Sequence, residues 1–244
     1  MKECSKSIPR RLRDSNFIAR YFRGSGIDIG GAPDPLALYT SLFPLITSVR
    51  TWDLEDGDAQ YMEGVADQSY DFVHSSHCLE HLRDPFQGLF HWFRVVRPGG
   101  FLIVTLPDED LYEQGTFPST FNLDHKNTFT IHKETSWSQK SINVFDLIHS
   151  LGSEAAVQKI ELIDHSYRYD LPRFDQTLTP VAESAVEFIV RRRDHSELEF
   201  RGVPARIMQT DPLLRVHLNQ YRDDIKTLKQ ANSSHPPFKN DTEV

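Results

Sequence analysis

Gly26-Ile27-Asp28-Ile29-Gly30-Gly31-Ala32-Pro33-Asp34-Pro35 is the stretch that decides the fold class of this 244-residue chain. A short apolar run containing an acid is followed by a tight Gly-Gly turn. After the turn, Asp34 is a suitable N-cap and Pro35 a suitable first residue for a helix. Strand, glycine turn and helix form the unit with which open α/β sheets build a binding pocket at their carboxyl edge.

Strand and helix patterns alternate on both sides of this stretch. Because such alternation is typical of parallel βαβ units, we expect a Rossmann-like, doubly wound α/β fold with helices on both faces of the sheet. Strands are predicted at 27–29, 48–52, 70–74, 101–105, 157–163 and 185–191, and helices at 36–45, 85–96 and 141–151.

Two regions depart from the alternation. Residues 107–140 are rich in Gly, Pro, Ser, Asn and acids, and irregular segments of this length are usually functional or disordered. Six aromatic residues in or next to this segment favour an ordered lid insertion: Tyr112, Phe117, Phe121, Phe129, Trp137 and Phe145.

The second region is the C-terminal part. Apolar residues there are spaced 4, 3, 4 and 3, which predicts a helix with a short heptad seam. They are Leu214, Leu218, Tyr221, Ile225 and Leu228. The seam can pack on its own domain or on a partner, such as a second copy in a homodimer. We therefore expect a main domain over 1–205 and a C-terminal helix with a disordered tail over 206–244.

Composition narrows the class of protein. With 27 Lys and Arg against 35 Asp and Glu, the formal charge is −8, which argues against a nucleic-acid partner. A basic N-terminal stretch can contact an anion or form a solvated helix face, and we favour the second. It contains Arg10, Arg11, Arg13, Arg20 and Arg23.

Cellular location is also indicated by composition. Two cysteines, Cys4 and Cys78, do not imply a disulfide framework. No apolar run reaches the roughly 20 residues of a membrane span, and the N-terminus lacks an apolar signal region. We expect a cytoplasmic protein.

The glycine turn disfavours phosphate-containing cofactors. Pro33 and Pro35 have no N–H to donate to a pyrophosphate, and the carboxylate of Asp34 would repel one. The chain also lacks the P-loop pattern. The cofactor must therefore be recognised without a phosphate group.

S-adenosylmethionine meets this requirement. Asp28 can attract its cationic amino group, and Gly30 and Gly31 let the backbone approach closely. Asp53, which ends the second strand, can accept hydrogen bonds from both ribose hydroxyls, and Asp58 from the adenine amino group. Further contacts are predicted at Leu54, Ala59, Ser75, Ser76 and His77.

Five spaced motifs occur in the order found in class I S-adenosylmethionine-dependent methyltransferases, which the chain resembles over about residues 20–107. The resemblance is nearest to bacterial small-molecule enzymes with a Leu-Glu-His-Leu segment. It implies a seven-stranded sheet whose last strand is antiparallel, formed here by 157–163 and 185–191. Ala32 departs from the family's usual glycine. The motifs are Asp28-Ile29-Gly30, Asp53 with Asp58-Ala59, Tyr70-Asp71-Phe72-Val73, Leu79 to Pro85, and Arg97-Pro98-Gly99-Gly100.

This resemblance implies transfer of a methyl group from S-adenosylmethionine, which leaves S-adenosylhomocysteine. The expected acceptor is a hydroxyl group of a small molecule or saccharide, in surface-polysaccharide or natural-product biosynthesis. A noncatalytic partner protein that keeps the cofactor fold and acts through its C-terminal helix is the alternative.

A hydroxyl nucleophile benefits from a base with a pKa near neutrality, which histidine provides. His125, beside Asp124 in the lid, is the predicted catalytic base. His125 can instead hold the lid to the domain. Asp108 and Glu109 are alternative bases, although they can equally bind substrate hydroxyls or solvate a turn.

One competing motif is a metal pattern. His77-Cys78-Leu79-Glu80-His81 matches the H-x-x-E-H arrangement of zinc proteases. The same letters arise from the Leu-Glu-His-Leu segment that directly follows a predicted strand. We therefore expect Glu80 and His81 to brace the start of a helix, and we predict no metal site.

Overall fold

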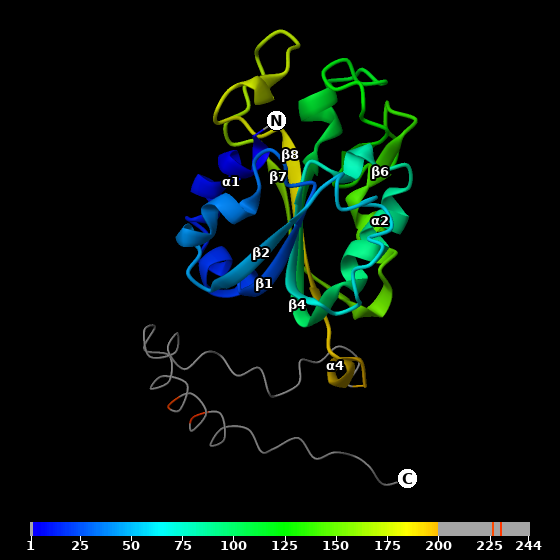
Figure 1. Ribbon diagram of the computed structural model, residues 1–244. Coiled ribbons are helices and arrows are strands. Elements are labelled where there is room, and N and C mark those ends of the chain that lie inside the picture. The colour runs from blue at the N-terminus through cyan, green and yellow to red at the C-terminus, as the bar shows by residue number, and fades with distance from the viewer. Residues whose placement is uncertain (1, 200–225, 227–229, 231–244) are drawn as a thin grey trace. The chain divides into compact units, whose positions relative to one another are not determined.

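The computed structural model describes residues 2–199, 226 and 230, and a central β-sheet organises them (Figure 1). The strand order is β2-β1-β3-β4-β8-β7. All neighbours up to β4 are parallel, whereas β8 is antiparallel to both β4 and β7. The strands are β1 (Gly24–Ile29), β2 (Ile46–Trp52), β3 (Tyr70–Ser76), β4 (Val96–Pro107), β7 (Ala155–Ile163) and β8 (Ala185–Arg192).

The sheet contains a topological switch point between β1 and β3. From β1 the chain goes outward to β2 and then returns to the other side of β1. Ile29 is in register with Trp52 of β2 and with Ser75 of β3, so the strands end at one common edge. In open α/β sheets, ligands bind in the crevice that such a reversal creates at the carboxyl edge.

Helical segments cover both faces of the sheet, so the doubly wound prediction is confirmed. Figure 1 shows α1 (Glu3–Arg11) on one side and α2 (Pro85–Arg94) on the other. Successive β4 residues alternate between two cores. Phe101 and Ile103 join the core beneath α1, while Leu102 and Val104 join the core beneath α2.

The sheet has six strands in the described residues, and the expected seventh is absent. Only residues 53–69 connect β2 to β3, and they form turns. A parallel neighbour needs a crossover of a dozen or more residues on each side. This connection is too short for an extra edge strand with two crossovers. The expectation of an antiparallel last strand, β8, is confirmed.

The helical predictions are correct in position but differ in detail. The segment predicted at 36–45 is a 3-10 helix, η2 (Leu36–Leu42). The segment predicted at 141–151 contains a short strand followed by a helix, β6 (Ser141–Asn143) and α3 (Val144–His149). β4 begins at Val96, before the strand predicted at 101–105. Its pairing with β3 is irregular near this end, because Tyr70 pairs with Val96 whereas Phe72 pairs with Phe101.

The lid region is an ordered part of the domain. β5 (Thr128–Thr130) and β6 form a two-stranded parallel sheet, and Phe129 is fully buried in the core. The lid also contains η4 (Glu109–Glu113). The short elements elsewhere in the domain are η1 (Phe17–Tyr21), η3 (Leu79–His81), η5 (Gly152–Glu154), η6 (Gln176–Leu178) and α4 (His195–Glu199).

Two regions of the chain bear on the remaining predictions. Arg10 and Arg11 lie in α1 and bind acidic residues of the domain, so the favoured solvated face is wrong for them. The predicted C-terminal helix, tail and domain boundary near 205 lie outside the described residues. No described helix has both the length and the apolar character needed to cross a membrane.

Candidate active site

Two adjoining cavities lie at the carboxyl edge of the sheet, beside the glycine turn. Their volumes are about 190 and 270 Å³. Four residues line both cavities: Gly30, Ala32, His77 and His81. Because these residues follow β1 and β3, the cavities occupy the switch point of the sheet.

The larger cavity combines apolar walls with two acids, Asp53 and Asp124. Trp52, Leu54 and Ala59 line it together with Asp53. Asp53 Oδ2 accepts a hydrogen bond from the Ala32 backbone N–H at 2.8 Å, so its carboxylate reaches the glycine turn. An apolar slot with an acid at its edge suits a nucleoside.

The smaller cavity has an acidic lining, which includes Glu3, Asp28, Asp34 and Glu80. Gly31 and Ser76, two of the predicted cofactor contacts, also line it. Such a lining suits a cationic ligand group. The sequence did not point to Glu3, because nothing local links the N-terminal helix to this edge of the sheet.

The helix after the glycine turn begins differently from the prediction. Asp34 is not its N-cap, because its carboxylate accepts hydrogen bonds from the Ser5 backbone N–H and the Tyr39 hydroxyl. Asp28 Oδ2 instead accepts from the Leu36 N–H at 2.7 Å. Asp28 thereby positions both the glycine turn and η2, beside the cavity that it lines.

Asp58 and Ser75 line neither cavity. Asp58 Oδ1 accepts from the Gln60 N–H at 2.8 Å, which closes a local turn. The Ser75 hydroxyl donates to the Ile29 carbonyl at 2.9 Å and is fully buried between β1 and β3. The geometry therefore gives both residues structural partners.

A buried polar network supports Asp28 from within the sheet. His74 Nδ1 lies 2.6 Å from Asp28 Oδ1, and His74 Nε2 lies 2.8 Å from Arg11 Nη1. Arginine only donates, so Nε2 accepts and Nδ1 donates to Asp28. Arg11 also binds Glu187 and Thr105. Sequence reasoning missed this network, whose members lie on five separate elements.

The predicted catalytic pair is divided between two other partners. His125 Nδ1 lies 2.7 Å from Glu113 Oε1. Asp124 Oδ2 instead lies 2.9 Å from His81 Nδ1. The pairing of His125 with Asp124 was therefore wrong, because neighbouring residues in an irregular loop direct their side chains to different sides.

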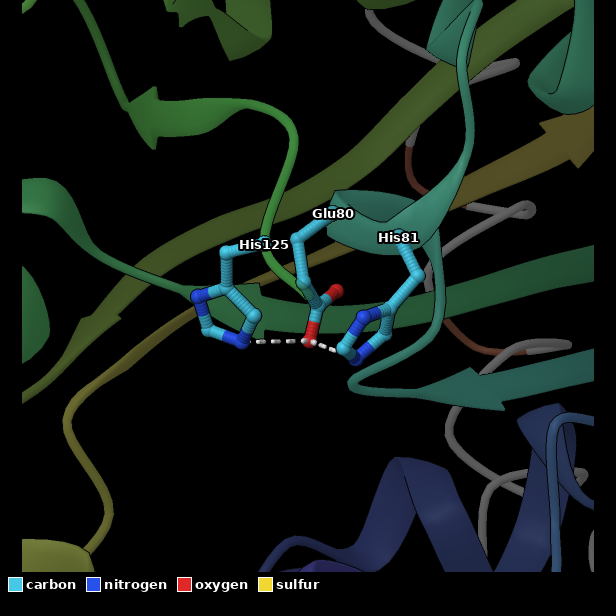
Figure 2. Close-up of side chains that lie close together, drawn as sticks. All are labelled: Glu80, His81 and His125. Carbon is cyan, nitrogen blue, oxygen red and sulfur yellow. Dashed lines mark ion pairs between the residues drawn. The ribbon is translucent and has the colours of Figure 1, made fainter. Parts of the chain in front are cut away.

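His125 and His81 converge on the carboxylate of Glu80, as Figure 2 shows. Glu80 Oε1 lies 3.9 Å from His125 Nε2 and 3.7 Å from His81 Nε2. His77 Nδ1 lies 3.6 Å from the same oxygen. These separations exceed hydrogen-bond distances, and both oxygens of the buried Glu80 lack hydrogen-bond partners.

Backbone hydrogen bonds bring these residues together. The N–H groups of Lys126 and Asn127 donate to the Glu80 carbonyl oxygen at 2.9 and 3.3 Å. The Asn127 side chain donates to the Leu82 carbonyl at 2.8 Å. The lid is thus attached to η3, and His125 lies beside Glu80 as a result.

The electrostatics of the cluster reflect its burial. Burial raises the pKa of Glu80, an effect that His81 and His125 partly oppose. Burial also lowers the pKa of His77 to about 3, so this imidazole is neutral at physiological pH. His77 has a φ of 55°, which is unusual outside glycine and often marks a functional site.

The alternative bases are engaged elsewhere. Asp108 accepts from the backbone N–H groups of Asp110 and Leu111, and burial raises its pKa to about 6. Glu109 binds Lys133 at 2.7 Å. The zinc-protease arrangement is also absent, because His77 precedes the short η3 in a left-handed conformation rather than lying on one long helix.

Comparisons with known proteins agree with this geometry. Residues 44–104 match the family model of the methyltransferase domain. These residues, a quarter of the chain, are similar to a methyltransferase domain. No curated protein matches the sequence.

Solved structures resemble the chain at low sequence identity. A candidate S-adenosylmethionine-dependent methyltransferase from Listeria monocytogenes superposes with a TM-score of 0.51 at 10% identity, covering 80% of this chain and 100% of that one. An S-adenosylmethionine-dependent methyltransferase from Archaeoglobus fulgidus gives a TM-score of 0.49 at 16% identity, covering 79% and 95% of the two chains.

The lining of the crevice fits S-adenosylmethionine. The apolar cavity beside Asp53 suits a nucleoside, and the acidic cavity suits the cationic amino acid end. Gly30, at a φ of 72°, joins the two cavities, and a side chain there would meet Cys78 within 2.7 Å.

Proposed function

We propose that this methyltransferase methylates a hydroxyl group of a small molecule or saccharide, in surface-polysaccharide or natural-product biosynthesis. The observation that supports the proposal is the cluster of Glu80, His81 and His125 next to the cofactor crevice. A neutral amine attacks a methyl donor without help, whereas a hydroxyl gains from removal of its proton. A histidine cluster beside the crevice suits that harder nucleophile.

Cofactor binding is assigned to the two cavities. Asp53 accepts hydrogen bonds from the ribose hydroxyls, and Leu54 and Ala59 contact the nucleoside. Asp28 and Ser76 lie at the amino acid end, with Gly30 and Gly31 allowing close approach. Bound S-adenosylmethionine supplies an electrophilic methyl group on a sulfonium.

The residues around the cluster orient and activate the acceptor. His125 Nδ1 donates to the Glu113 carboxylate. His81 Nδ1 donates to the backbone carbonyl of Asp124 and lies 2.9 Å from the Asp124 carboxylate, so each Nε2 is directed toward Glu80. Such carboxylates fix the tautomer and orientation of an imidazole. We propose that His125 lies where the acceptor hydroxyl loses its proton, and that the lid excludes water from this end of the crevice.

The test begins with cofactor binding. Calorimetry with S-adenosylmethionine should show one site, and Asp53→Asn should weaken binding by about 10- to 100-fold through loss of a charged hydrogen bond. Asp58→Asn is the matched control, because Asp58 lines neither cavity. Absence of cofactor binding by the unaltered protein would overturn the proposal.

The second stage identifies the acceptor. The protein is incubated with S-adenosylmethionine and a panel of nucleotide-linked sugars, free saccharides, phenols and amines, and release of S-adenosylhomocysteine is measured. Nuclear magnetic resonance of the product then locates the methyl group. Methylation of oxygen supports the proposal, whereas transfer only to nitrogen or sulfur contradicts it.

A further inference from the structure

We propose that Glu80, His81 and His125 bind a divalent transition-metal ion, such as Zn²⁺ or Co²⁺, at the end of the cofactor crevice. Each residue directs one ligand atom to a common point, and these atoms lie within 4.8 Å of one another. Figure 2 shows the two imidazoles on either side of the Glu80 carboxylate. The sequence-based expectation contained no metal.

The distances suit ligands of one ion better than direct contacts. Glu80 Oε1 lies 3.7 and 3.9 Å from the Nε2 atoms of His81 and His125. Nitrogen and oxygen ligands of tetrahedral zinc, at about 2.0–2.1 Å from the metal, lie roughly 3.4 Å from each other. A shift of a few tenths of an ångström would bring the Glu80 oxygen and each imidazole nitrogen to that spacing.

The outer partners of both histidines match those of metal-bound imidazoles. A metal-binding histidine almost always donates its second N–H to a carboxylate, a carbonyl or water. Here His125 Nδ1 donates to the Glu113 carboxylate at 2.7 Å, and His81 Nδ1 donates to the backbone carbonyl of Asp124 at 3.3 Å, with the Asp124 carboxylate 2.9 Å away. Both Nε2 atoms are therefore unprotonated and available to bind a metal ion.

The local charge also calls for a cation. Glu80 is fully buried, and neither of its oxygens has a hydrogen-bond partner in the described residues. Glu113 is buried as well, and its Oε2 likewise has no hydrogen-bond partner there. No lysine or arginine of the described residues forms an ion pair with either side chain. Burying carboxylates in this way is costly unless a cation or a proton compensates them.

The donor set selects the class of ion. Two imidazole nitrogens and one carboxylate oxygen suit Zn²⁺ and neighbouring transition metals, whereas Mg²⁺ and Ca²⁺ prefer oxygen ligands throughout. Three protein ligands leave a position open for water or substrate. Because Glu80 and His81 line the smaller cavity, that position faces the crevice.

This arrangement gives the metal a role that rests on the proposed function. An acceptor hydroxyl that enters the open position would have its pKa lowered by the ion. The proton would then leave to solvent or to a neighbouring base, and the oxygen would attack the methyl carbon while the carbon–sulfur bond breaks and S-adenosylhomocysteine leaves. His125 would act as a ligand that positions the ion, with its Nε2 lone pair on the metal.

The experiment measures metal binding without turnover. Full-length protein with no histidine tag is treated with a chelator, dialysed, and titrated with Co²⁺ and Zn²⁺. We expect about one equivalent to bind, visible as Co²⁺ absorption bands of a four- or five-coordinate site and as heat in calorimetry with Zn²⁺. Absence of stoichiometric binding overturns the proposal.

Variants then locate the ion. Glu80→Gln and His125→Ala should each weaken Zn²⁺ binding by 100-fold or more, and Glu113→Gln by about 10- to 100-fold as an outer partner. His195→Ala is the matched control, because His195 and Glu199 form an exposed pair on α4. Equal binding by the cluster variants and the control overturns the assignment.

Circular dichroism establishes that each variant is folded, and Glu80→Gln, which keeps the side-chain shape, provides the decisive comparison if His125→Ala does not fold. Failure of the proposed function can be distinguished from failure of the metal site. In the first case the metal still binds, but the protein does not bind the cofactor or does not transfer a methyl group. Methyl transfer by protein that binds no metal overturns the metal site alone.

Discussion

Two buried clusters of histidine and carboxylate lie close together in this domain, and they differ in how their charges are matched. In the first, Glu187 binds Arg10 and Arg11, and Arg11 continues through His74 to Asp28. In the second, Glu80 has three histidine nitrogens at 3.6–3.9 Å and no direct hydrogen bond. In the first cluster, every charge therefore has a partner within the protein.

This difference distinguishes a cluster that holds the fold together from one that can bind a ligand. A buried charge with partners on several elements holds those elements together, as Arg11 holds α1 to the sheet. A buried charge without partners destabilises the fold and is typical of positions that bind a ligand. Both clusters flank the cofactor crevice, so one positions it and the other supplies its chemistry.

The largest effect is expected at His125. His125→Ala should reduce the rate of methyl transfer by about 10²- to 10⁴-fold, because the acceptor hydroxyl loses its activating group. Cofactor affinity should be kept, since His125 lines neither cavity. Steady-state kinetics and calorimetry measure the two quantities. His132→Ala, an exposed histidine of the same lid region, is the control, and equal rates for both variants would refute the assignment.

Arg11 tests the matched cluster. Arg11→Met should lower the free energy of unfolding by about 3–5 kcal/mol, because Glu187 loses one cation in a buried site. Urea denaturation measures this change. Arg13→Met is the control, since Arg13 is exposed on the same segment. Similar stability of the two variants would mean that the Arg11 network does not hold α1.

Two isosteric substitutions should change the free energy of unfolding in opposite directions. Glu187→Gln removes the partner of two arginines and should destabilise the protein at pH 7. Glu80→Gln removes an unmatched charge and should stabilise the metal-free protein by about 1–3 kcal/mol. Urea denaturation of both variants in chelator measures the difference. A destabilising Glu80→Gln would show that the Glu80 charge is matched without a metal.

Lowering the pH should abolish the difference in the free energy of unfolding between the wild type and Glu187→Gln. Burial alone would raise the pKa of Glu187, but Arg11 and Arg10 hold it well below its usual 4.5. A lowered folded-state pKa means that the stabilisation is present above pH 4.5 and is lost as the pH falls toward the folded-state value. Unfolding measured between pH 7 and pH 3 should show the two proteins converging, and a constant gap would contradict this linkage.

The smallest effect on stability is expected for an exposed pair of histidine and carboxylate. His195 and Glu199 are 3.5 Å apart on the surface of α4. Solvent screens such a pair, so His195→Ala should change the free energy of unfolding by less than about 0.5 kcal/mol. Thermal denaturation and the methyl-transfer rate should both stay close to wild type. A large loss would show that exposure does not explain the contrast with the buried clusters.

Most of the fold was predictable because its signals are local. The strands after residue 24 follow short apolar runs, and α2 begins where Asp84 caps it and Pro85 starts it. The missing seventh strand could have been inferred from the short connection over 53–69. The first helix was harder to interpret, because five arginines in 23 residues are typical of a solvated face whereas Arg11 is fully buried.

The candidate site was predictable only in part. The acid at the end of β2 and the glycine turn line the crevice, since strand ends meet at one edge of a parallel sheet. The partners of His125 and Asp124 could not be predicted, because side-chain direction in an irregular loop depends on long-range contacts. Glu80 appeared in a recognisable motif, but its lack of hydrogen-bond partners is a property of the folded protein.

By itself the sequence determined the α/β class and the position of the crevice, and it argued against phosphate cofactors. These follow from periodicity, turn residues and missing N–H donors, which act over a few positions. Only the tertiary structure decided which charges are matched. Arg11 and Glu187 are 176 positions apart, and His81 and Asp124 are brought together only when the lid packs on η3. Such pairings depend on the packing of whole elements, which no local pattern encodes.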